Sequence, residues 1–247
     1  MSCKYDPENP FKEKRANPQA TVSPAVSKGL KVEHFFSTPD VHPFDQLQWE
    51  KRSAKIMGDD GRPIFQQHDI EVPTSWSQLA TKVVASKYFY GDVDTGRREN
   101  SVKQLVHRVC RTIADRGARD GYFAAEEDAE AFYNELTWLC VNQYGAFNSP
   151  VWFNVGLFDI YGVEGSRHNF HWDPAAEDAV PCQNSYEFPQ ASACFIQSVK
   201  DSMQDIMRLA ASEAMLFKHG SGTGTDLSTL RSSKEKLSGG GKPSGPL

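Results

Sequence analysis

Residues 187–203 read EFPQASACFIQSVKDSM and place a single cysteine, Cys194, in an apolar run that is followed at once by an acidic helix start. The run from Ala193 to Val199 predicts a buried strand, and the residues after Asp201 predict a helix. Cysteine usually behaves as a small buried hydrophobe, so the Cys194 thiol is either core or a reactive group. A strand joined directly to a helix indicates an α/β fold for this part of the chain.

The helix after Asp201 carries apolar residues that we expect to face inward: Met203, Ile206, Met207, Ala210, Ala214 and Phe217. The glycine-rich run GSGTGT over 220–225 follows this helix and lacks the third glycine of a dinucleotide fingerprint. GGGKPSG over 239–245 is not a phosphate loop, because Pro243 replaces the required Ser or Thr. Both runs are either flexible turns or places where backbone approaches a ligand closely.

Toward the amino terminus the pattern changes twice, which predicts three regions. Residues 144–247 contain AFNSPVWFNVGL near their start and consist of short apolar segments between Gly, Pro and Asn, with a long loop over 161–189. Residues 46–143 carry helical stripes and predict a helical domain. Residues 1–45 contain six prolines and predict an extended arm that lies on a larger body.

Within 46–143 we expect a short strand at His68–Val72 and then three helices. The first starts at Pro73 and ends near Lys87. The second presents one apolar stripe made of Val102, Leu105, Val106, Val109, Cys110 and Ile113, so Cys110 is predicted to be core. The third runs from about Ala125 to Tyr144 and ends at Gly145, in the position of a left-handed cap.

Composition excludes several classes of protein. The 247 residues carry a formal charge of −5 with 24% charged residues, which gives no basic surface for nucleic acid. No apolar run is long enough for a membrane span, and the start lacks a signal peptide, so the predicted location is the cytoplasm. The five cysteines are widely spaced and odd in number, which is unlike a secreted disulfide framework.

Two further clusters leave alternatives open. Four side chains could ligate zinc, but their spacing is unlike that of a finger or ribbon, so no metal site is predicted: His168, His171, Cys182 and Cys194. One basic segment lies in the glycine-rich region, and it is either a solvated loop or an anion site for nucleotide phosphate: Arg231, Lys234, Lys236 and Lys242.

Four collinear motifs resemble the large catalytic chain of ribonucleotide reductases: NSPVWFNVGL, PQASACFIQSV, FKHGSGTGTDLSTLR and LSGGGKPSGPL. Two amino-terminal stretches, KVEHFFSTPDVHPFDQLQWEKR and VPTSWSQLATKVVASKYFYG, are similar to the class II, vitamin B12-dependent enzymes. The resemblance implies an amino-terminal helical domain followed by the first part of a ten-stranded α/β barrel. It also implies conversion of ribonucleotides to deoxyribonucleotides by a cobalamin-initiated radical mechanism, with most of the adenosylcobalamin site outside this chain.

The resemblance also implies roles for single residues. Cys194 matches one half of the redox pair that reduces the ribose 2′ position, while Ser149, Ala193 and Gly222 match substrate-proximal residues. Three positions match those that bind a deoxynucleotide or ATP effector: Asp201, Ser202 and Arg231. In the family, the helix matched by 201–217 contributes to a dimer interface, so a homodimer is implied.

No N-x-C-x-E motif occurs in the sequence, so the radical cysteine of the family has no match here. We therefore expect an amino-terminal part that needs a second chain carrying the rest of the barrel and that is inactive alone. A split subunit, an interrupted gene and an incomplete sequence all remain open, as does a diphosphate or triphosphate substrate. The alternative is a non-catalytic nucleotide-binding or assembly module, or an inactive fragment.

Overall fold

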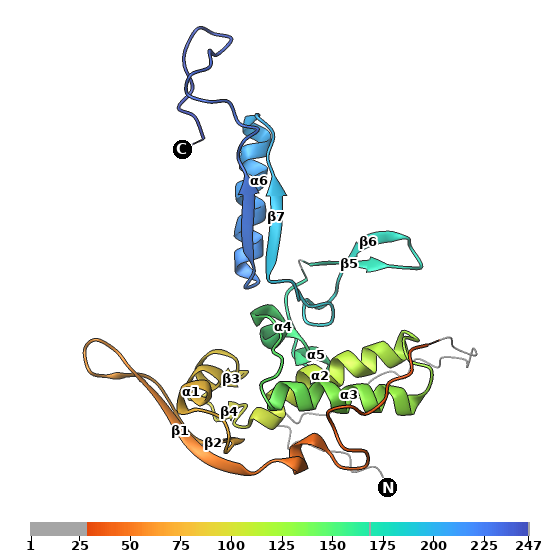
Figure 1. The fold of residues 1–247 in the computed structure, drawn as a ribbon. Helices are drawn as coiled ribbons and strands as arrows, with labels where there is room; N and C mark the ends of the chain where they lie inside the picture. Colours follow the sequence, from red (N-terminus) through yellow and green to blue (C-terminus); the bar gives the residue numbers. More distant parts are fainter. Residues whose placement is uncertain (1–28, 168, 247) are drawn as a thin grey trace. The chain divides into compact units, whose positions relative to one another are not determined.

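The structure, a computed structural model, describes residues 29–167 and 169–246, and Figure 1 shows its elements. Contacts between residues divide the chain into two compact units. Val151–Pro189 group with the residues up to Phe147, and Asn148–Pro150 group with the residues from Gln190 onward. The predicted domain boundary at 143/144 stays a prediction. The compact units divide the chain differently, since 151–189 group with the helical region.

A long antiparallel hairpin precedes the helices, so the predicted helical domain also contains a sheet. It is made of β1 (Trp49–Met57) and β2 (Pro63–Pro73), after a short 3-10 helix η1 (Pro43–Gln46). Only the His68–Val72 part of this hairpin was predicted. A register shift between Arg52 and Ala54 breaks the two-residue period that would reveal β1.

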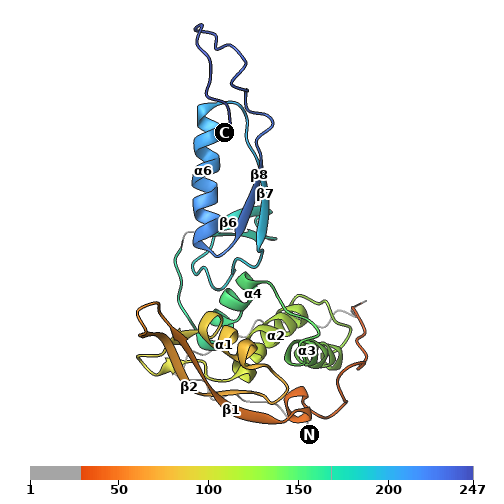
Figure 2. The same ribbon diagram turned by 60° about the vertical axis from the view of Figure 1, so that its left-hand side comes forward.

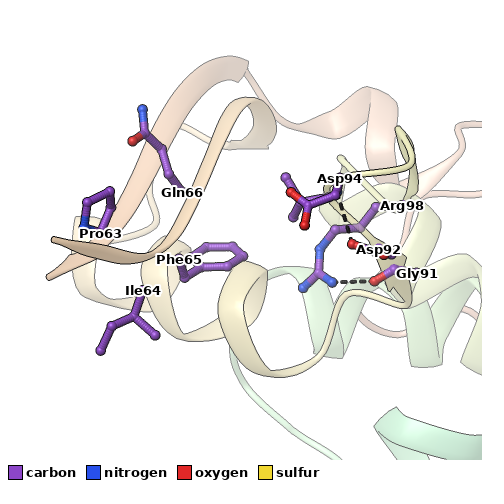
Figure 3. Close-up of a pocket in the computed structure, with 9 residues that line it drawn as sticks. Pro63, Ile64, Phe65, Gln66, Gly91, Asp92, Asp94 and Arg98 are labelled. Carbon is purple, nitrogen blue, oxygen red and sulfur yellow. Dashed lines mark hydrogen bonds between the residues drawn. The ribbon is translucent and has the colours of Figure 1, made fainter. Parts of the chain in front are cut away.

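The first helix, α1 (Gln78–Lys87), begins later than predicted, since its cap is Ser77 and not the Pro73 segment. The Ser77 hydroxyl accepts a hydrogen bond from the Ala80 amide at 3.0 Å, whereas Pro73 ends β2. A small hairpin, β3 (Gly91–Asp92) and β4 (Arg97–Arg98), follows α1. Between it and β2 lies an open cavity of about 480 Å³, lined among others by Phe65, Asp92, Asp94 and Arg98 (Figure 3).

The main core is provided by two neighbouring helices that run antiparallel, α2 (Val102–Arg119) and α3 (Glu126–Val141). Ser101 and Gln104 form a capping box at the start of α2. The predicted stripe of α2 is confirmed, and Cys110 is fully buried within it. The end of α3 differs from the prediction, because the left-handed residue is Gln143 (φ 61°) rather than Gly145.

The described part of the predicted arm, from residue 29 onward, lies along α3. The Val32 amide donates to Asp128 Oδ1 at 2.9 Å. Further along, the Phe36 and Ser37 amides donate to the Glu135 carboxylate, and Phe36 stacks on Trp138. Residues 1–28 of the predicted arm, which include Cys3, lie outside the described residues.

A buried polar group joins η1 to the two long helices. Tyr133 Oη lies 2.8 Å from His107 Nδ1 and 3.1 Å from His42 Nε2, and all three side chains are buried. Burial lowers the pKa of His107 to about 4, with the Arg111 guanidinium acting in the same direction. Burial also lowers the pKa of His42. Both imidazoles are therefore neutral in the folded protein at pH 7.

This burial predicts acid sensitivity of the first unit. Below pH 6.5 the unfolded chain binds a proton at His107, whereas the folded chain does not bind it until about pH 4. The free energy of unfolding therefore falls as the pH falls through this window. For His107 alone the loss by pH 5 is about 2 kcal/mol. Urea unfolding at pH 7.5 and pH 5 should show that His107→Gln loses this part of the pH dependence. An unchanged difference between the two pH values in that variant would contradict the assignment.

The segment after α3 is fixed to α2 by the buried side chain of Arg108. Arg108 and Glu99 are both fully buried, with Nε and Oε1 2.8 Å apart. The Arg108 guanidinium also donates to the carbonyls of Trp152 and Val155, at the end of α4 (Ser149–Asn154). Gly156 follows with φ +81°, and a Cβ there would lie 2.4 Å from the Arg108 carbonyl oxygen. Only glycine allows α2 to approach this closely.

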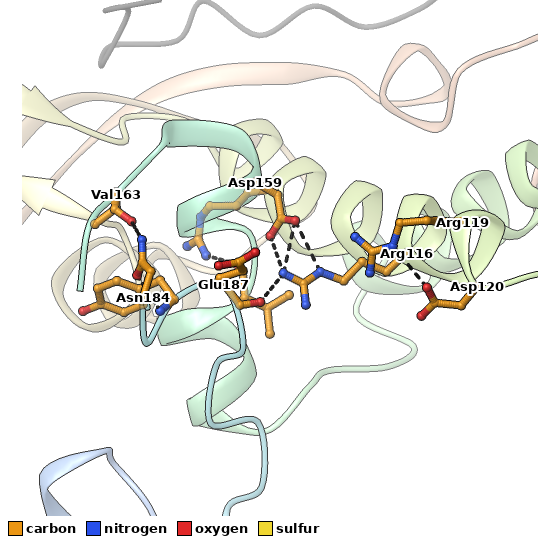
Figure 4. A network of polar contacts seen from close by, with 10 residues as sticks. Arg116, Arg119, Asp120, Asp159, Val163, Asn184 and Glu187 are labelled. Atoms are coloured by element: carbon orange, nitrogen blue, oxygen red, sulfur yellow. Dashed lines mark hydrogen bonds and ion pairs between the residues drawn. The ribbon is translucent and has the colours of Figure 1, made fainter. Parts of the chain in front are cut away.

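Residues 161–189, predicted as a loop, contain structure of their own. After α5 (Leu157–Tyr161) comes a hairpin of β5 (Phe170–Asp173) and β6 (Asp178–Pro181). Figure 4 shows how the flanks are held: Arg116 pairs with Asp159 at 2.9 Å and donates to the Glu187 carbonyl, while Asn184 donates to the Val163 carbonyl at 3.0 Å. These contacts between side chains distant in sequence leave no local pattern to predict.

The second unit contains β7 (Cys194–Ser198), α6 (Met203–Lys218) and β8 (Gly222–Asp226). The two strands are parallel, and α6 connects them and lies beside them (Figure 2). This agrees with an α/β start of a barrel, and the described residues contain no closed barrel. None of the helices within the described ranges combines the length and the apolar character that a membrane span requires.

The orientation predicted for α6 is wrong. Its partly buried positions lie along one side of the helix: Asp205, Ile206, Leu209, Ser212, Glu213 and Leu216. Of the predicted inward residues only Ile206 is among them, whereas the exposed ones form an outer stripe: Met203, Met207, Ala210, Ala214 and Phe217. Because α6 is apolar on two faces, the sequence pattern does not distinguish the face toward β7 and β8 from the face toward solvent.

Candidate functional site

The two parallel strands present one face to α6 and leave the other open. Residues that pair directly in a parallel sheet share a face. Thr223 and Thr225 donate to Glu213 Oε1 of α6, at 2.8 and 3.2 Å, so they and their partners Phe195 and Gln197 face the helix. The alternate residues form the opposite face, which we call the open face: Cys194, Ile196, Ser198, Gly222, Gly224 and Asp226.

Two of the predicted substrate-binding positions, Cys194 and Gly222, lie on the open face, and a third, Ala193, is bonded to Gly222 through its backbone. Cys194 pairs in register with Gly222, and the Gly222 amide donates to the Ala193 carbonyl at 2.6 Å. A Cβ on Gly222 would meet only that carbonyl oxygen, at 3.7 Å, which is ordinary contact. Packing within this unit therefore does not require glycine at 222, and the absent side chain leaves space in front of the Cys194 thiol.

Cys194 is exposed, which corrects the prediction of a buried strand position. The physical reason is that, among the described residues, β7 has one neighbouring strand and a helix on one face, so no described element covers the open face. Ile196, next to Cys194 on this face, is 88% exposed. An apolar side chain of this kind is normally covered, so this face is suited to further packing.

Thiol accessibility predicts a clear difference in chemical reactivity among the cysteines. Cys110, Cys140 and Cys182 are buried, and burial raises the pKa of the Cys110 thiol, so it stays protonated. We expect iodoacetamide at pH 8 to modify Cys194 at least about 100-fold faster than Cys110, which corresponds to a local opening of about 3 kcal/mol. Peptide mass spectrometry over time measures both rates. Equal rates would show that Cys194 is covered in solution.

The predicted effector residues are also close to one another. Arg231 Nε lies 2.6 Å from Asp201 Oδ2, and both side chains are partly exposed. The cap of α6 is Ser202 rather than Asp201, because the Ser202 hydroxyl accepts from the Asp205 amide at 3.2 Å. A guanidinium beside the amino-terminal end of a helix suits a phosphate group.

Ser149 is the first residue of α4, and its segment Asn148–Pro150 belongs to the same compact unit as Cys194. Sequence reasoning missed Glu213, which joins α6 to β8. The available signal was a glutamate on the face of α6 that packs against β7 and β8. The prediction assigned the opposite face of α6 as the inner one, so Glu213 was expected to be outside. Among the described residues no group of three or more His, Cys, Asp or Glu side chains is arranged to hold a metal; His168 is not described.

Comparison with known proteins identifies the class. A family model described as "Ribonucleotide reductase, barrel domain" matches residues 192–247, which include β7, α6 and β8. A second, described as "Class II vitamin B12-dependent ribonucleotide reductase", matches residues 50–143. The chain belongs to the family of class II vitamin B12-dependent ribonucleotide reductases, of which it carries an amino-terminal portion.

Curated relatives agree with this assignment, and all three described here are named vitamin B12-dependent ribonucleotide reductase. The protein of Rhodopirellula baltica is 62% identical over 221 residues, which cover 89% of this chain and 21% of that protein. Those of Streptomyces coelicolor and Agrobacterium fabrum are 43% and 36% identical, covering 90% and 87% of this chain and 20% of each relative. The chain therefore spans about a fifth of the length of these relatives.

The family implies a cobalamin cofactor, and the cavity beside Phe65 and Arg98 does not fit it. The cavity beside Phe65 and Arg98, at about 480 Å³, has the size of a drug-like ligand, whereas a corrin ring with its nucleoside is much larger. The Arg98 guanidinium is also already bonded to the Gly91 and Ala85 carbonyls. We therefore derive no chemical step through the cofactor from these residues.

Proposed function

We propose that this chain supplies the reducing thiol and part of the substrate surface of a ribonucleotide reductase. The observation that carries the proposal is the exposed Cys194 thiol on the open face, paired with Gly222 in a segment that matches the reductase barrel. Gly222 and Gly224 carry no side chains, so a ribose can approach both backbone and thiol. The remaining strands of the barrel would cover this face and exclude water.

In the proposed reaction Cys194 acts with a second thiol from the rest of the barrel. The two thiols deliver two electrons and two protons, the ribose 2′-hydroxyl leaves as water, a C–H bond replaces the C–O bond, and the thiols end as a disulfide. Ser149 and the Ala193 backbone would hold the substrate beside the thiol. The substrate is a ribonucleotide, and the proposed location of this reaction is the cytoplasm.

Complementation tests the function. A second chain covering the rest of the barrel, mixed with this chain, adenosylcobalamin, a ribonucleotide and a dithiol, should form deoxynucleotide, because unpaired strand edges of β7 and β8 can be completed by a partner. The 247-residue chain alone should form none above a control without protein. Product from this chain alone would overturn the assignment of the radical step to the missing part.

A second candidate function, a nucleotide-binding and assembly module, is favoured by the Asp201–Arg231 pair and the outer stripe of α6. In that case two copies pack through their α6 helices and bind an effector without catalysis. Binding of ATP or a deoxynucleoside triphosphate and dimerisation in sedimentation, together with no turnover after complementation, would favour this module over the reductase.

The effector role of Arg231 gives a quantitative prediction. Arg231→Ala removes charge-assisted hydrogen bonds to phosphate and should weaken binding of a deoxynucleoside triphosphate by about 10- to 100-fold. Isothermal calorimetry with dimeric protein measures the dissociation constant. Lys218→Ala, which removes an exposed cation at the other end of α6, is the control and should change it less than about twofold. Equal effects of both variants would indicate only a loss of net charge.

A further inference from the structure

The start of β7 and the start of β8 are tied together by side chains outside the ladder of backbone hydrogen bonds. Ser221, immediately before Gly222, is 6% exposed and donates its hydroxyl proton to the Ser192 carbonyl at 2.6 Å. Gln190 Nε2 lies 3.2 Å from the same Ser192 carbonyl and 3.2 Å from Ser221 Oγ. We call Gln190, Ser221 and the Ser192 carbonyl the clasp.

The position of the clasp relates it directly to the thiol. Ser192 lies two residues before Cys194, and Ser221 lies one residue before Gly222, the partner of Cys194 in register. The Ser221 amide also donates to the Leu216 carbonyl at 3.0 Å, so the end of α6 is tied to the same point. A clasp at this point limits sliding of β7 against β8, and a slip by one residue would move Cys194 to the α6 face.

We propose that Gln190 and Ser221 are positioning residues that hold Cys194 opposite Gly222 on the open face. Neither side chain is proposed to touch the reacting atoms; each acts through the backbone of the two strand starts. The importance of this position for turnover rests on the proposed redox role of Cys194. The effect of the clasp on the register of β7 and β8 does not depend on that role.

Disulfide trapping tests register without any catalytic assay. In the 247-residue chain, Gly222→Cys places a second thiol opposite Cys194, and the roughly 4.8 Å between neighbouring strands lies within the Cα–Cα range of disulfides. Oxidised glutathione converts the two thiols to a disulfide and is itself reduced to two glutathione molecules, so the equilibrium gives an effective concentration. Peptide mapping by mass spectrometry quantifies the cross-link.

We expect Ser221→Ala to lower this effective concentration by about tenfold, because one buried hydrogen bond is lost. Ser221→Thr, which keeps the hydroxyl, should restore it, and Gln190→Ala should lower it from the other side of the clasp. Ser212→Ala, a partly buried serine of α6, is the matched control and should leave it unchanged. An unchanged effective concentration in both Ser221→Ala and Gln190→Ala would overturn the proposal.

Turnover in the complemented enzyme separates this proposal from the proposed function. If trapping falls in Ser221→Ala and kcat falls with it while KM is kept, both proposals are supported. If trapping falls and kcat does not, the clasp stands and the redox role of Cys194 is contradicted. If trapping is unchanged, the clasp is wrong whatever the turnover.

Discussion

Cys194→Ser in the complemented enzyme is expected to abolish turnover, lowering kcat by at least about 10³-fold, the scale on which removal of an essential reacting group acts. Serine replaces the thiol with little change in volume, and residue 194 is exposed within this chain, so folding and strand pairing should survive. The hydroxyl cannot form a disulfide, so it cannot supply the electrons for reduction of the ribose. Deoxynucleotide formation with a dithiol reductant measures the effect.

Two controls test whether the loss of turnover is specific to the Cys194 thiol. Cys182→Ser changes a buried thiol that bonds to the Asn169 carbonyl and has no place on the open face, so it should leave kcat within about threefold if the protein folds. Substrate binding to the Cys194→Ser enzyme should be kept, because the thiol contributes electrons rather than affinity. Turnover of the Cys194→Ser enzyme at the parent rate would return Cys194 to the class of small hydrophobic residues.

The second large effect concerns stability. Arg108→Met leaves Glu99 buried without its ion pair, and loss of one partner of a buried pair costs about 3–5 kcal/mol. Burial acts to lower the pKa of Arg108, but Glu99 outweighs it and holds the pKa above its ordinary value, so the lost group is a full charge. Urea unfolding followed by tryptophan fluorescence measures the change.

Two further variants separate the charge from the shape of the side chain. The double variant Arg108→Met with Glu99→Gln removes the unpaired charge, while the amide still accepts a hydrogen bond from Tyr161, so it should recover about 2 kcal/mol. Arg119→Met removes an exposed arginine that pairs with Asp120 and should cost less than about 1 kcal/mol. Single and double variants of equal stability would show that packing, and not the charge, dominates.

Parts of this fold follow from local sequence patterns and parts do not. The stripe of α2 was predictable because its apolar residues recur at helical spacing and face one core. The hairpin of β1 and β2 was largely missed, since a bulge interrupts its period. The face of α6 was assigned wrongly because both of its faces are apolar, and only pairing with β7 and β8 selects the inner one.

The candidate site follows a similar division. The motif around Cys194 and the glycines of β8 were recognisable from sequence, but their pairing in register depends on contacts across 28 residues, from 194 to 222. The exposure of Cys194 was not predictable, because an apolar run indicates burial without indicating by what. The Asp201–Arg231 pair joins residues 30 positions apart and has no local signal.

The same separation between β7 and β8 matters while the polypeptide is being made. At 5–20 residues per second, about 1–6 s pass between synthesis of Cys194 and of its partner Gly222. During this interval β7 has no strand beside it, and Ile196 has no cover on the open face. Parallel strands cannot pair until the connecting helix has formed, so the nascent segment exposes an apolar strand edge that holdase chaperones are suited to bind.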